Sequence, residues 1–314
     1  MSPTRFPVWD LFYTVGASFN AVDAWHPDGG QYVGYWCDDG SCATPGTVTV
    51  LDSTTGQPLR KPRDIVDGDG DIVSLAYVDE GRSLLAFDSD ARILLVDAET
   101  LQPRGEPFDV LGKFANGCCT TPIGDGSTAM VYEWSGDGES THWRVLDIGD
   151  GEVLSEGDLD NMFVQASVAS PDGSTVAVSG DIDQIVTIDV AAGAEQRRST
   201  GLGSIVLWLK YSDDGELLVS GAHDGGVSLW DATTLDLLGT VYPPHEGDPV
   251  PSGAQFIGDT HDVAIASYDG RVYRWETDLD RTIDFACQMA GRSLTEDEWE
   301  EFLPEQPYQD VCPA

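Results

Sequence analysis

The chain has 314 residues, of which 16 are basic and 55 acidic, so its formal net charge is −39. This charge excludes nucleic acid and anionic membranes as expected partners, because both are bound through clustered Lys and Arg. No apolar run reaches the ~20 residues of a membrane span, and the first residues lack a signal-peptide pattern. With 41% hydrophobic residues and nine Trp, we expect a soluble, cytoplasmic protein with a sizeable core.

The first predicted element is a strand over residues 6–15 (FPVWDLFYTV). A repeated pattern of three strands then occupies residues 21–276, with six visible copies, among them SPDGSTVAVSGDIDQIVTIDVAAG (170–193). An acid closes the third strand of each copy at Asp52, Asp97, Asp147, Asp189, Asp231 and Glu276. The turn between the first two strands contains Asp28, Glu80, Asp125, Asp172, Asp214 and Asp259. A period of 42 to 50 residues with short alternating strands is typical of β-propeller blades.

The repeat resembles that of the WD-repeat (WD40-type) family, in which Ser-Pro-Asp-Gly, Ser-Gly-x-x-Asp-Gly and Trp-Asp recur in this order. Residues 211–231 and 255–276 are the closest copies. The resemblance implies an all-β fold, a β-propeller over residues 1–277 with six visible blades, seven being possible. It also implies a hydrogen-bond network in the last blade, formed by His245, Ser267, Asp269 and Trp275.

The last copy of the repeat lacks a fourth strand, and the N-terminal strand is available to supply it. Because an open sheet edge invites aggregation, we expect these two ends of the chain to pair and close the ring. Deletion of residues 1–16 should then destabilise the whole propeller in thermal unfolding.

Residues 278–314 form a different, helical tail that we expect to pack on the propeller. Thr295 and Glu298 form a capping box, Pro304 ends the helix, and Gly291 can end a preceding helix. The tail resembles that of actinobacterial WD-repeat proteins, which often carry a STAND-type NTPase, a kinase or a transcriptional regulator. The matching motifs are Ala286-Cys287, Ala290-Gly291-Arg292, Leu294-Thr295, Glu298-Trp299, Leu303-Pro304, Pro307-Tyr308 and Cys312-Pro313.

Two cysteine pairs are candidates for disulfide bonds. Cys287 pairs with or lies beside Cys312 in the tail, and Cys37 and Cys42 flank a predicted hairpin turn. A reducing cytoplasm opposes both bonds.

Motifs for catalysis or cofactor binding are missing from the sequence. There is no phosphate-binding loop, no His-Glu-x-x-His and no nucleophile elbow, and the five His are scattered singly. The acids of residues 67–71 (DGDGD) lack the Gly and Glu that a Ca²⁺ loop requires. We therefore expect no catalytic, cofactor-binding or metal-binding residues.

The sequence favours a non-enzymatic protein-interaction scaffold or sensor module of a bacterial signalling system. The alternative is an enzyme or small-molecule binder that uses the central channel, as in propeller hydrolases and lactonases. Such a site needs convergent His and carboxylates at the channel mouth, which the scattered His disfavour.

The predicted partner is a basic, Arg-rich protein segment bound at one face of the propeller. In blades of this type, the turn between the second and third strands and the link into the next blade emerge at the same face. Acids gather in these turns, where Asp88, Asp90 and Asp181 also lie, although Asp is common in turns for local hydrogen bonding. The candidate partner-binding residues are Asp38, Asp39, Trp134, Phe163, Asp183, His223, Asp224, Tyr268 and Asp269.

Overall fold

The computed structural model describes residues 22–26, 28–36, 46–66, 71–90, 92–109, 120–134, 140–243, 253–258, 260–266 and 271–312. Within these residues, the strands form six antiparallel sheets, each a meander in chain order. The first three sheets contain β1 (Val22–Trp25), β2 (Gln31–Trp36) and β3 (Thr47–Asp52); β4 (Ile72–Val78), β5 (Ser83–Asp88), β6 (Arg92–Asp97) and β7 (Phe108–Asp109); and β8 (Thr120–Ile123), β9 (Thr128–Trp134), β10 (Ser140–Asp147) and β11 (Val153–Asp160).

The other three sheets lie in the second half of the chain. They contain β12 (Val164–Ala169), β13 (Thr175–Gly180), β14 (Ile185–Asp189) and β15 (Ala194–Arg198); β16 (Val206–Tyr211), β17 (Leu217–Ala222), β18 (Val227–Asp231) and β19 (Leu237–Val241); and β20 (Ala254–Ile257), β21 (Thr260–Ala266) and β22 (Val272–Trp275). A short 3₁₀ helix, η1 (Asp79–Gly81), joins β4 to β5. The helices α2 (Leu279–Ala290) and α3 (Glu296–Phe302) follow the last strand.

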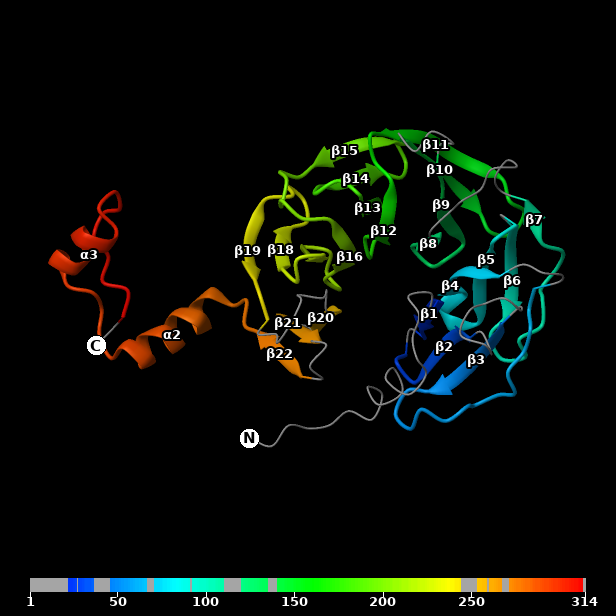
Figure 1. Ribbon diagram of the computed structural model, residues 1–314, viewed down its shortest axis with the longest axis horizontal. Coiled ribbons are helices and arrows are strands. Elements are labelled where there is room, and N and C mark those ends of the chain that lie inside the picture. The colour runs from blue at the N-terminus through cyan, green and yellow to red at the C-terminus, as the bar shows by residue number, and fades with distance from the viewer. Residues whose placement is uncertain are drawn as a thin grey trace.

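The six sheets are arranged side by side around an arc, as the blades of a propeller are (Figure 1). The first strands of neighbouring sheets contact one another, in the pairs β1–β4, β4–β8, β8–β12 and β12–β16, and therefore line the inside of the arc. The fourth strands lie outside, and every residue of β15 is exposed. The predicted all-β propeller with six visible blades and a helical end is thus confirmed.

The core consists of apolar layers between successive sheets. Five buried clusters each join residues of one sheet to residues of the next. Trp230 at the end of β18 is fully buried in the layer between the fourth and fifth sheets, and its indole Nε1 donates to Ser220 Oγ at 2.9 Å. Each blade is therefore stabilised chiefly by its neighbours, as in other repeat architectures.

Asp residues end five third strands in the way the repeat predicted, and each begins the same turn. The strands β3, β6, β10, β14 and β18 end at Asp52, Asp97, Asp147, Asp189 and Asp231. Their side chains accept hydrogen bonds from backbone amides two or three residues ahead. The residue four positions after each Asp has a positive φ and donates its amide to that Asp carbonyl. This residue is Gly in three turns but Leu101 and Leu235 in the others, where burial of the side chain offsets the backbone strain.

The tail forms two helices after the last sheet. In Figure 1, α2 and α3 extend away from the sheets. The beginning of α2 is fixed by Arg281, whose guanidinium lies 3.1 Å from Glu276 and 3.6 Å from the buried Asp262. The Asp278 side chain caps the helix by accepting from the Arg281 amide. These contacts set the direction in which α2 leaves the last sheet.

The tail is closed by a disulfide bond between Cys287 of α2 and Cys312, one of the two pairings considered above. Around α3, the capping box of Thr295 and Glu298 is present, and Gly291 ends α2 in the left-handed conformation. Cys37, Cys42 and the predicted N-terminal strand over residues 6–15 lie outside the described residues, so the pairing of Cys37 with Cys42 and the closure of the ring stay predictions.

Candidate functional site

The predicted binding face is the end of the sheets where second strands pass into third strands. In the fourth and fifth blades these turns contain Asp183 and Asp224. The links that enter β12 and β16 emerge at the same end, since Phe163 and Ile205 precede these strands. The described turns and links of the fourth and fifth blades therefore emerge at the same end of the sheets.

Two predicted aromatic residues meet on this surface. Trp134 at the end of β9 stacks on Phe163, which precedes β12 in the next blade, with ring centroids 3.6 Å apart. The Trp134 indole donates to the Val164 carbonyl at 3.2 Å, and the Phe163 amide donates to Asp181 at 2.7 Å. Both rings are half-buried, so they expose a flat apolar surface beside the Asp181 carboxylate.

Asp183 and Asp224 contact neighbouring residues of the link between the fourth and fifth blades. The Asp183 carboxylate accepts from the Gly203 amide at 2.8 Å, and the Ser204 hydroxyl accepts from the Asp224 amide at 3.1 Å. Asp224 also accepts from Tyr242, at 3.2 Å, and its negative charge raises the pKa of that phenol. The Asp183 carboxylate therefore positions the link, and the Asp224 carboxylate accepts from the Gly226 amide of its own turn at 3.0 Å. Both carboxylates keep free lone pairs for a ligand.

Other predicted residues have different surroundings. His223 is exposed next to Asp224, with its amide bonded to the Ile205 carbonyl. Asp88, in the predicted acidic turns, is buried and pairs with Arg92 at 2.7 Å, so its charge stabilises the turn. Four candidates, Asp38, Asp39, Tyr268 and Asp269, lie outside the described residues, as do His245 and Ser267 of the predicted network and residues 67–70.

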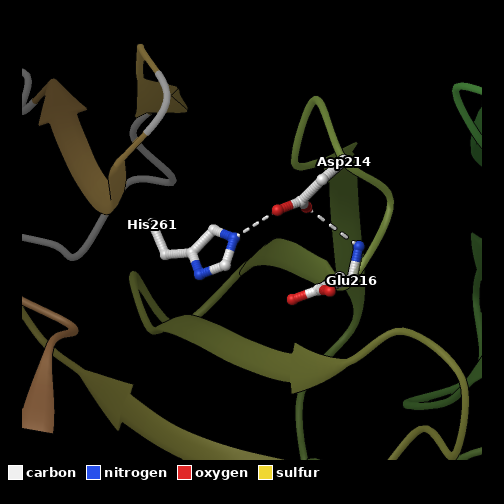
Figure 2. Close-up of side chains that lie close together, drawn as sticks. All are labelled: Asp214, Glu216 and His261. Atoms are coloured by element: carbon white, nitrogen blue, oxygen red, sulfur yellow. Dashed lines mark hydrogen bonds and ion pairs between the residues drawn. The ribbon is translucent and has the colours of Figure 1, made fainter.

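A group that sequence reasoning missed lies at the opposite end of the fifth and sixth blades. Asp214 and Glu216 belong to the turn between β16 and β17, and His261 of β21 points toward them from the next blade (Figure 2). The His261 ring Nε2 lies 2.7 Å from Asp214, and one donor atom of each residue lies within 4.8 Å of the others. One imidazole and two carboxylates are ligands that a divalent transition metal accepts.

The Asp214 carboxylate is held mainly by its own turn. The Ser212 hydroxyl and the Glu216 amide donate to it, at 2.7 and 3.0 Å, and together with His261 they lower the pKa of Asp214 to about 2. The pairing of Asp214 with His261 joins residues far apart in the sequence, so no local pattern could have revealed it. As it stands, the group contains a hydrogen bond between His261 and Asp214 across a blade boundary.

Comparisons with known proteins support the fold. Residues 197–231 match the family model described as WD domain, G-beta repeat. The hydrazine synthase of Kuenenia stuttgartiensis has a similar structure, with a TM-score of 0.65 and 15% identity over 82% of this chain and 83% of that chain. A comparison with curated proteins finds no match. None of the helices in the described ranges is long and apolar enough to cross a membrane.

The matched residues contain β16, β17 and β18, with the buried Trp230 near the end of β18. Together with the six sheets around an arc, this match identifies the fold as a β-propeller of the WD40 type.

Proposed function

We propose that the chain is a non-enzymatic interaction module of a bacterial signalling or regulatory system. WD40 propellers commonly mediate protein–protein contacts, and their loops from several blades can contact one partner. The expectation that the chain is not an enzyme rests on the missing sequence motifs.

The ligand that suits the described face best is a basic, Arg-rich protein segment. The observation that supports this is the stacked pair of Trp134 and Phe163, with Asp181 beside it and Asp183 and Asp224 in the neighbouring turns. A guanidinium group stacks on aromatic rings and binds carboxylates through two parallel hydrogen bonds. The face supplies both features, whereas a Lys-rich segment uses only the charge.

The test replaces Asp183 and Asp224 together by Asn, which keeps the hydrogen bonds to the loops and removes two charges. A labelled Arg-rich peptide is titrated in a salt series, with fluorescence anisotropy as the readout. We expect affinity at low salt to fall about three- to tenfold, because each exposed ion pair contributes roughly 0.2–1 kcal/mol. The difference in affinity between the natural chain and the variant should shrink as salt rises, since salt screens the attraction between the two carboxylates and the peptide.

A matched control removes two charges from the opposite end of the fifth blade. Asp213 and Asp236 are exposed in the turns on the far side of the fifth sheet, and replacing both by Asn gives the same net charge. Equal loss of binding in both double variants would show that only the overall charge attracts the peptide, and the proposed face would be wrong.

A further inference from the structure

The tail exposes three large apolar side chains to solvent. Phe285 and Met289 of α2 are 65% and 74% exposed, and Phe302 of α3 is 64% exposed. Phe285 and Met289 are four residues apart, so they lie next to each other on one face of the helix. No large apolar residue of the described sheets is as exposed as these three.

This exposure is not the result of a tail without structure. Trp299 of α3 is buried, its indole donates to the Gln306 carbonyl at 2.9 Å, and the Tyr308 ring packs edge-on against it. The Arg292 guanidinium binds both oxygens of Glu298, at 2.6 and 2.7 Å. With the disulfide bond, these contacts hold the tail in one shape, so its apolar face is presented in a fixed form.

The charge of the chain indicates what can cover this face. Residues 278–312 contain ten acidic residues and two Arg, a net charge of −8, and the rest of the chain contains 45 acidic and 14 basic residues, a net charge of −31. Docking on the same chain's propeller, or on the tail of a second copy, would bring two acidic surfaces together. Like charges in an interface disfavour such contacts. A basic partner surface, by contrast, is attracted by the same acidic residues.

We propose that the tail is a docking module, separate from the propeller face, that places Phe285 and Met289 in an apolar groove of a partner protein. The rim of that groove carries Lys and Arg, which face Asp284 and the acids of α3. This is the helix-in-groove mode of recognition, in which a few apolar side chains on one helix face supply the affinity. The neighbouring acids select the partner by its charge.

The experiment uses the full chain and two designed helical peptides as probes. One peptide has a Leu stripe flanked by Lys, and the other has the same stripe flanked by Glu. Binding is measured by fluorescence anisotropy for the natural chain and for the variant Phe285→Gln with Met289→Gln, which keeps good helix-forming residues. A matched control, Leu237→Thr with Leu238→Thr, removes two exposed apolar residues from the outer strand β19.

We expect the natural chain to bind the Leu/Lys peptide and not the Leu/Glu peptide. In the tail variant, the affinity for the Leu/Lys peptide should fall about tenfold or more, because apolar anchors carry most of the energy of such interfaces. The β19 variant should bind within about twofold of the natural chain. Equal binding by all three chains would overturn the proposal. A dimer in analytical ultracentrifugation that the tail variant alone dissociates would also overturn it, in favour of a second copy.

The same variants separate this proposal from the proposed function. The Asn substitutions at Asp183 and Asp224 should leave tail-dependent binding of the Leu/Lys peptide unchanged. The tail variant should leave binding of the Arg-rich peptide at the propeller face unchanged. Failure of the proposed tail site can therefore be distinguished from failure of the proposed propeller site.

Discussion

The sheets and the tail differ in what their large apolar residues do. In the sheets, Trp143 and Trp230 are fully buried between blades, and exposed apolar residues are found mainly on outer strands. Among the large apolar residues of the tail whose burial is described, Trp299 alone is buried, and Phe285 and Met289 face solvent. Both regions are ordered, but by different means, because the sheets use stacked apolar layers and the tail uses a covalent bond and polar contacts. The propeller therefore buries its large apolar residues in a core, whereas the tail holds two of them exposed to solvent.

The first prediction concerns a core residue of the sheets. Trp230→Ala should lower the free energy of unfolding by about 3–5 kcal/mol, because it removes a large buried side chain and leaves a cavity. It also leaves the Ser220 hydroxyl without its indole donor. Leu238→Ala, at an exposed position in the same sheet, should cost less than about 1 kcal/mol. Urea unfolding followed by circular dichroism measures both values, and similar costs would contradict the layered core.

The second prediction concerns the tail. Cys287→Ser with Cys312→Ser removes a bond between residues 25 positions apart, which stabilises the tail by at most about 3.5 kcal/mol in the loop-closure model. We expect faster amide hydrogen exchange in α2 and α3 and more solvent exposure of Trp299. The sheets should exchange as before, since their apolar layers do not include these cysteines. Loss of protection across the sheets would mean that the tail and the propeller unfold together.

The third prediction concerns the recurring turn after the third strand. Gly193 has a φ of +63°, and a Cβ there would have adequate space, with Ser155 at 3.4 Å as its nearest neighbour. Gly193→Ala should therefore cost only the backbone strain of the left-handed conformation, about 1–2 kcal/mol. Equal stability of Gly193→Ala and the natural chain would show that the turn can relax.

The sequence predicts the repeated features of the fold better than the unique ones. The acids at the ends of the third strands are visible because the same position recurs in each blade, and hydrogen bonding in the turn explains them. Leu101 and Leu235 could not be recognised as left-handed residues, because Leu rarely adopts that conformation and only burial makes it tolerable here. A local pattern also says nothing about which blades meet, so the pairing of His261 with Asp214 was missed.

For the candidate face, the sequence identified residue types but not their contacts. Trp134 and Phe163 were both predicted near the surface, yet their stacking depends on how the third and fourth blades pack. Asp88 was placed among the acids of the binding face, but Arg92 neutralises it. The direction of α2 depends on Arg281 and its distant partner Asp262, a contact that only the folded chain creates.

The smallest expected effect is a pH dependence confined to the tail. The Arg292 guanidinium, and after it the Thr295 amide, lower the pKa of Glu298 to about 2, from an ordinary value of 4.5. Because the pKa is lower in the folded tail, the stabilisation is fully present above pH 4.5 and is lost as the pH falls through about 2. An NMR titration of the Glu298 carboxyl carbon should show its midpoint near that lower value. Arg292→Gln removes the main cause, so the midpoint should move upward while the sheets keep their spectrum. A midpoint that stays in place in this variant would show that the capping box alone holds the carboxylate, and the Arg292 pair would then have no part in presenting the apolar face.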